Sequence, residues 1–143
     1  MTQAVPKKTV RVVAALIPKP GERSRFLVQQ RLPRGSRALL WEFPGGKVEP
    51  GESEPEALAR ECQEELDVRL QVGRQLWAGR HEYVDLVVEL VLYAARLEAG
   101  EPKPLGANAL AFLTPQEMRA LPFCEADIPL LEELEAGRWE PLD

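Results

Sequence analysis

Two apolar stretches near the start of the chain have the composition of β-strands. Residues 9–18 are rich in β-branched side chains and predict a buried strand. Residues 26–31 predict the strand that returns after a turn at residues 20–21. A polar loop at residues 33–37 and a glycine-containing turn at residues 41–47 are expected to follow.

Residues 54–66 have the hydrophobic spacing of an α-helix. Ser53 and Glu56 have the S-x-x-E spacing of a capping box, which predicts where this helix begins. Asp67 follows at the position where helices commonly end in a left-handed residue. The stripe that is expected to face the core consists of Leu58, Ala59, Cys62 and Leu66.

The second half of the chain predicts more strands and then two short helices. Strands are expected at residues 69–79, twice within residues 80–98, and at residues 110–113. Helices are expected at residues 115–121 and 125–134. Strands that flank one early helix and two late ones predict the α/β (α+β) class, with helices on both faces of a mixed sheet in an α/β/α sandwich.

Length and composition restrict the class of protein. A chain of 143 residues fits a single domain, residues 1–143, with one substantial core. The net charge of −5 argues against nucleic acid or a membrane surface as a partner, because phosphate surfaces attract basic proteins. Two distant cysteines and a short polar start predict no disulfide framework and no signal peptide, so we expect a cytoplasmic protein. Charges interrupt the longest apolar segment, and no membrane span is expected.

Three carboxylates gather on the helix predicted at residues 54–66. Glu61, Glu64 and Glu65 are spaced by three and four residues, so their side chains are neighbours on one helical arc. Like charges at this spacing repel one another unless a cation lies nearby. Arg60 points to a different arc, which leaves a hard divalent cation, Mg²⁺ or Mn²⁺, as the candidate. The alternative is an acidic helix face exposed to water.

The spacing of residues 46–68 resembles the Nudix box, G-x5-E-x7-R-E-U-x-E-E-x-G-U, in which U is a bulky apolar residue. Gly46, Glu52 and the run Arg60-Glu61-Cys62-Gln63-Glu64-Glu65 stand at its fixed positions. Two positions depart from the pattern, because Cys62 replaces an aliphatic residue and Asp67 replaces a glycine. The resemblance implies the Nudix fold and the hydrolysis of a nucleoside diphosphate that is linked to another group.

The same resemblance implies roles for the residues of the box. Its implied metal ligands are Gly46, Glu61, Glu64 and Glu65, and its implied catalytic residues are Arg60, Glu61 and Glu64. We expect Arg60 to be oriented by an ion pair with Glu52, and we leave open which glutamate is the general base. Four other acids are expected to be ordinary surface charges: Glu42, Glu49, Glu54 and Glu56.

Residues 41–47 and 126–131 resemble the MutT branch of this family, which includes 8-oxo-dGTP-sanitising enzymes and CTP and 5-methyl-dCTP pyrophosphohydrolases. The implied substrate-binding residues are Arg31, Phe43, Lys47 and Asp127. Phe43 would line the base pocket and Asp127 would read the base edge, whereas the two cations would contact phosphate. A carboxylate only accepts hydrogen bonds, so Asp127 would favour bases that offer donors. The alternative is that Arg31 and Lys47 are ordinary surface charges and that Asp127 is a simple helix-start residue.

MutT-type relatives usually carry a further glutamate in the loop before the strand at residues 110–113, where this chain has Gly106. The general base would then come from the helix, or activity would be reduced.

The leading hypothesis is Mg²⁺-dependent hydrolysis of (deoxy)nucleoside triphosphates, including oxidised or modified ones such as 8-oxo-dGTP, to the monophosphate and pyrophosphate. Hydrolysis of ADP-ribose or dinucleoside polyphosphates, and a non-catalytic nucleotide sensor, are the alternatives. The expected partner is a small nucleotide, and a monomer and a homodimer both remain open.

Overall fold

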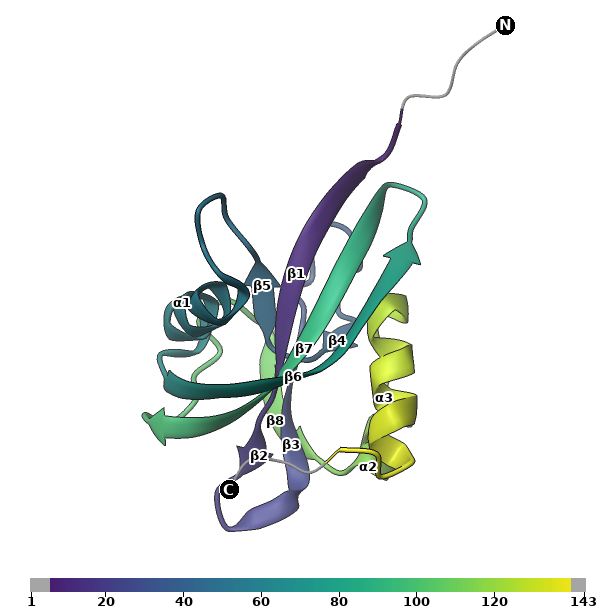
Figure 1. Cartoon of the computed structure of the whole chain (residues 1–143). Coiled ribbons are helices and arrows are strands. Elements are labelled where there is room, and N and C mark those ends of the chain that lie inside the picture. Colours follow the sequence, from purple (N-terminus) through teal and green to yellow (C-terminus); the bar gives the residue numbers. More distant parts are fainter. Residues whose placement is uncertain (1–5, 140–143) are drawn as a thin grey trace, which may run out of the picture.

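The computed structural model describes residues 6–139 as two β-sheets with helices on both sides (Figure 1). The strands are β1 (Lys8–Leu16), β2 (Pro18–Lys19), β3 (Glu22–Gln30), β4 (Trp41–Glu42), β5 (Gly45–Lys47), β6 (Arg69–Glu82), β7 (Leu86–Ala99) and β8 (Ala109–Leu113). The helices are α1 (Glu54–Leu66), α2 (Pro115–Met118), the 3₁₀-helix η1 (Glu125–Asp127) and α3 (Ile128–Glu135).

The first sheet is mixed and the second is antiparallel. In the first sheet, with strand order β5-β1-β7-β6, β1 is parallel to β7 and the other neighbours are antiparallel. In the second sheet β3 pairs with β2, β4 and β8. The stretch predicted as one strand at residues 9–18 therefore divides between the sheets, with β1 in the first and β2 in the second.

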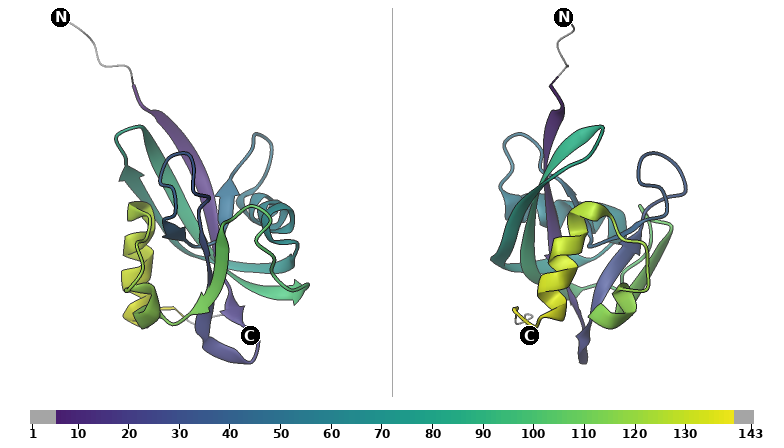
Figure 2. Two further views of the ribbon diagram at one scale, coloured as in Figure 1. Left: turned by 180° about the vertical axis from the view of Figure 1, so that it is seen from behind. Right: turned by 90° about the vertical axis from the view of Figure 1, so that its right-hand side faces the viewer.

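Helices α1 and α3 cover opposite sides of the sheets, as Figure 2 shows from behind and from the side. Val13 and Ala15 of β1 belong to the core under α1, whereas Ala14 and Leu16 belong to the core under α3. A strand that is buried on both faces has no polar side to show, which explains the continuous apolar run in the sequence. The predicted α/β/α sandwich around a mixed sheet is confirmed.

Helix α1 begins and ends where its local signals predict. Ser53 accepts a hydrogen bond from the Glu56 N–H at 3.2 Å, and the Ser53 N–H donates to the Glu56 carboxylate at 3.1 Å. Asp67 ends the helix in a left-handed conformation, with φ of 56°. Three predicted core residues of α1 are buried, but the fourth is Ala57 and not Ala59.

The prediction of three strands within residues 69–98 is wrong, because β6 runs without interruption to Glu82. Gly79 does not end the strand, since its missing side chain makes room for the Trp77 ring. The turn near Tyr83 forms as predicted, and the Tyr83 N–H donates to the Leu86 carbonyl at 2.8 Å. Residues 41–47, predicted as a turn, form the short strands β4 and β5. Among residues 6–139 no helix is long and apolar enough to cross a membrane.

Candidate functional site

Two adjoining cavities share the ion pair between Arg31 and Glu42, whose Nη1 and Oε1 atoms lie 3.1 Å apart. The first, called the apolar cavity, has a volume of about 200 Å³. Its floor consists of Val10, Val12, Leu86, Val88 and Leu90 from β1 and β7. The second, called the carboxylate cavity, has a volume of about 220 Å³, and Glu61 and Glu65 of α1 line it.

Glycines let the main chain approach both carboxylates of the carboxylate cavity. A Cβ atom added to Gly46 would overlap the Glu61 carboxylate, and one added to Gly106 would overlap the Glu65 carboxylate. The Gly106 N–H also donates to the main-chain oxygen of Glu65 at 3.1 Å. A side chain at position 106 would therefore require Glu65 to move.

Arg60 forms the predicted ion pair with Glu52 through two hydrogen bonds, from Nε at 2.6 Å and from Nη2 at 2.9 Å. The pair holds the pKa of Glu52 down, at about 2, with the Arg60 hydrogen bonds as the largest cause. The expectation that Arg60 would not reach the acidic arc is wrong. Its Nη1 lies 3.1 Å from Glu61 and 3.3 Å from Glu64, because its long side chain folds back across the helix surface.

The predicted metal ligands differ in their exposure and in whether they line the carboxylate cavity. Glu61 is 16% exposed, and burial raises its pKa, while the hydrogen bond from Arg60 opposes the rise. Glu65 lines the same cavity, and Gly46 lies directly against Glu61. Glu64 is 58% exposed and contacts Arg60. The carboxylate cavity thus brings together Glu61 and Glu65, and Glu64 is not among the residues that line it.

The oxygen atoms that line the carboxylate cavity are of the chemical type that a hard divalent cation binds. Within the described residues 6–139, no group of three or more His, Cys, Asp and Glu side chains is arranged to hold a metal ion. Glu61 and Glu65 nevertheless present carboxylates beside the main chain at Gly45, and Mg²⁺ prefers such oxygen ligands. The raised pKa of Glu61 indicates that nearby cations only partly offset its buried charge.

Asp127 is a buried wall residue of the apolar cavity. It is 6% exposed, and its Oδ2 accepts a hydrogen bond from the Phe43 N–H at 2.9 Å. Burial raises the pKa of Asp127 to about 8, and the nearby charge of Glu42 adds to the rise. Asp127 stands at the N-cap position of α3, as the alternative role of a helix-start residue requires, but its side chain makes no capping hydrogen bond there.

The side chain of Phe43, which was predicted to line the base pocket, lines neither of the two cavities. Phe43 is 3% exposed and packs against Phe123, with ring centroids 6.0 Å apart, in the core under α3. Residues along this extended segment point to alternate sides, so the neighbouring Glu42 faces the cavities and Phe43 faces the core. The backbone N–H of Phe43 donates to Asp127, which does line the apolar cavity.

Glu42 is not the ordinary surface charge expected from the sequence. It is 20% exposed, and it accepts hydrogen bonds from Arg31 at 3.1 Å and Gln29 at 3.0 Å. The pairing of β3 with β4 places Gln29 opposite Glu42, and this long-range register decides the position. Glu54 is also 20% exposed, and it accepts a hydrogen bond from the Tyr93 hydroxyl at 2.7 Å.

Of the two predicted cations, Arg31 lies at the junction of the two cavities and Lys47 lines the apolar cavity alone. Arg31 lines both of them, and its Nε is buried without a hydrogen-bond partner in the described part of the chain. Lys47 is exposed and lines the apolar cavity, while its carbonyl accepts a hydrogen bond from Arg60 at 3.1 Å. Arg37 and Tyr83 also line the apolar cavity, which could not be predicted because a polar loop and a turn carry no local signal that they meet.

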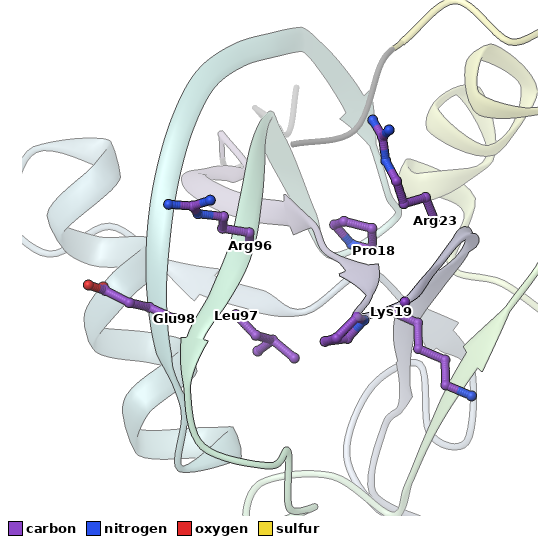
Figure 3. Close-up of a pocket in the computed structure, with 8 residues that line it drawn as sticks. Pro18, Lys19, Arg23, Arg96, Leu97 and Glu98 are labelled. Atoms are coloured by element: carbon purple, nitrogen blue, oxygen red, sulfur yellow. The ribbon is translucent and has the colours of Figure 1, made fainter. Parts of the chain in front are cut away.

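A third cavity, of about 500 Å³, lies elsewhere, between the β2–β3 turn and the end of β7 (Figure 3). Leu97 and Pro18 face its middle, whereas the charged groups of Arg96 and Glu98 point to the other side of the strand. No group of acids comparable to Glu61 and Glu65 lines it. Its chemistry does not suit a phosphate-cleaving site.

Comparison with known proteins agrees with this geometry. Residues 13–133 match the family model described as NUDIX domain. The chain is 37% identical over 131 residues to the CTP pyrophosphohydrolase of Escherichia coli (strain K12), which covers 92% of this chain and 95% of that protein. It is 33% identical over 97 residues to the 8-oxo-dGTP diphosphatase of Haemophilus influenzae, covering 67% and 69% of the two chains. The solution structure of the E. coli ORF135 protein is similar with a TM-score of 0.77, at 36% identity and 96% coverage of each chain. The chain therefore belongs to the Nudix hydrolase family, in its MutT-like branch.

Proposed function

We propose that this chain hydrolyses (deoxy)nucleoside triphosphates, including oxidised or modified ones such as 8-oxo-dGTP, to the monophosphate and pyrophosphate in the presence of Mg²⁺. The observation that carries the proposal is the junction of the apolar and carboxylate cavities at Arg31 and Glu42. An apolar floor with one buried acid, Asp127, suits a nucleobase. The adjoining carboxylates suit the metal-assisted cleavage of a phosphate chain. The names of the E. coli and H. influenzae relatives support the same substrate class.

The cation is proposed to bind between Glu61 and Glu65, with the main chain at Gly45 and Gly46 beside it. When bound, it would neutralise phosphate charge and make an attacking water easier to deprotonate. Glu64 would join these ligands if its side chain turned away from Arg60. Mn²⁺ would suit the same oxygen ligands.

Arg60 orients the acidic face and does not contact the substrate directly in this proposal. Its bonds to Glu52 and to the Lys47 carbonyl tie α1 to β5, which carries Gly46, and to the loop that follows it. This tie keeps Glu61 against Gly46. The general base is proposed to come from α1, because its glutamates line the carboxylate cavity and position 106 offers no carboxylate.

Arg31 and Lys47 are the proposed phosphate contacts. The unpaired, buried Nε of Arg31 retains a donor that a phosphate oxygen could accept. Lys47 reaches the apolar cavity from β5, beside the two glycines. Asp127 is proposed to contact the base edge from the far wall.

A phosphate- and pyrophosphate-release screen with Mg²⁺ tests the function. The substrates are dNTPs, NTPs, 8-oxo-dGTP, 5-methyl-dCTP, ADP-ribose and dinucleoside polyphosphates, and we expect pyrophosphate from at least one triphosphate. Glu61→Gln is expected to abolish this release without loss of fold, because it keeps the shape of the side chain but removes the charge. Cleavage of ADP-ribose alone would refute the triphosphate assignment, and cleavage of nothing would refute the enzyme assignment.

A further inference from the structure

The loop between β3 and β4, residues 31–40, closes one side of the apolar cavity. Ser36 and Arg37 of this loop line the cavity, and Tyr83 lines it from the β6–β7 turn. The base of the loop is closed by the Arg31 N–H, which donates to the Leu40 carbonyl at 2.9 Å. The loop is therefore a compact unit that forms one wall of the cavity.

Arg37 connects this loop to the β6–β7 turn. Its Nη1 and Nη2 donate to the two carboxylate oxygens of Asp85 at 3.1 and 3.3 Å, and its Cζ lies 4.2 Å from the centre of the Tyr83 ring. The side chain of Arg37 is 17% exposed. The Tyr83 hydroxyl accepts a hydrogen bond from the Ala126 N–H at 2.9 Å, so the ring is itself fixed to η1. A bidentate pair and a cation–π contact thus act on one guanidinium.

The backbone conformation of the loop indicates that the contacts of Arg37 hold the loop in position. Arg37 and Leu39 have φ values of 59° and 62°, in the left-handed region that residues with a Cβ rarely adopt. Such a conformation persists only when surrounding contacts hold it. The contacts of Arg37 with Asp85 and Tyr83 reach outside the loop and meet that need.

We propose that the ion pair between Arg37 and Asp85 is a clasp that positions the loop against the nucleoside part of a bound nucleotide. Asp85 is the positioning residue, and it acts through Arg37, which forms part of the cavity wall. The inference rests on the proposed function, because it concerns the substrate of the same site. Arg31 is the first residue of the loop, so the clasp also stabilises the junction at which the phosphates are proposed to bind.

The test compares three variants with the unsubstituted chain. Asp85→Asn removes the charge of the clasp, and Asp85→Glu keeps a carboxylate that can still reach Arg37. Glu82→Gln is the matched control, since Glu82 lies on the same hairpin but pairs with Lys7. Amide hydrogen exchange is measured without nucleotide, and KM and kcat are measured with the best triphosphate from the screen.

Asp85→Asn is expected to speed exchange at the amides of Arg31, Leu39 and Leu40, and to leave α1 unchanged. We expect KM to rise about threefold, in the range of one partly exposed ion pair. The kcat should stay the same, because the clasp contributes equally to substrate and transition-state binding. Asp85→Glu should restore most of the affinity, and Glu82→Gln should behave like the unsubstituted chain.

Unchanged exchange in Asp85→Asn would overturn the clasp. Faster exchange with an unchanged KM, or a fall in kcat alone, would overturn its role in positioning substrate. If the unsubstituted chain hydrolyses no triphosphate, the proposed function fails and the substrate half of the inference fails with it. The exchange rates still decide whether Asp85 holds the loop.

Discussion

Replacement of Asp127 by asparagine tests the electrostatics of the apolar cavity. Burial raises the pKa of Asp127 to about 8, with Glu42 adding to the rise, and the Phe43 N–H and Arg31 oppose it. In an unfolded chain an aspartate has a pKa of about 3.9. At a pH between these two pKa values, Asp127 is protonated in the folded chain and ionised in the unfolded chain.

The sign and size of the effect follow from this difference in bound protons. Because the folded state binds more protons, its free energy of unfolding falls as the pH rises through this window. One proton corresponds to about 1.4 kcal/mol per pH unit, so between about pH 5 and pH 7 the contribution of Asp127 falls by about 3 kcal/mol. Asp127→Asn removes this dependence, while its amide oxygen can still accept the Phe43 N–H.

The assay is urea unfolding of both chains across this pH range. We expect the variant to gain stability relative to the unsubstituted chain as the pH rises. Glu135→Gln is the control on α3, because the Arg119 hydrogen bond lowers the pKa of Glu135 and keeps it ionised in both states above about pH 5. The reasoning would be refuted if the free energy of unfolding of Asp127→Asn, minus that of the unsubstituted chain, stayed constant with pH or increased as the pH falls.

Two further substitutions test the carboxylate cavity. Gly106→Ala is expected to push the Glu65 carboxylate out of the cavity, so that more Mg²⁺ is needed for half-maximal turnover and kcat/KM falls about tenfold. An unchanged Mg²⁺ titration would show that Glu65 is not a ligand. Glu52→Gln is expected to lower kcat about tenfold with little change in KM, because Arg60 loses the partner that orients it. Glu49→Gln, which removes only a 3.8 Å contact with Arg60 from a 63% exposed side chain, is the control and should change neither constant.

Local signals predicted helix α1 well. The capping box at Ser53 and the left-handed end at Asp67 involve neighbours in sequence, so they could be read without knowledge of the fold. Arg60 shows the limit of a helical projection, which places the backbone but not the end of a long flexible side chain.

Positions that depend on strand pairing or on side-chain packing could not be predicted in the same way. Glu42 becomes a cavity residue only because β4 pairs with β3, and Phe43 then turns toward the core. Gly79 resembles a strand end in the sequence, but the Trp77 ring uses the space beside it and the strand continues. In each case the deciding contact joins residues whose relative placement is set by sheet register or side-chain packing.

The protonation of Asp127 also changes what is expected of base recognition. As an ionised carboxylate, Asp127 would only accept hydrogen bonds. With a pKa of about 8, the carboxyl group is mostly protonated at neutral pH and both donates and accepts, as an asparagine amide does. Asp127→Asn should therefore retain the ranking of triphosphates by kcat/KM near about pH 7 and differ from the unsubstituted chain at about pH 9, where Asp127 is ionised. A ranking that already differs at the lower pH would show that Asp127 meets the base as a charged acceptor.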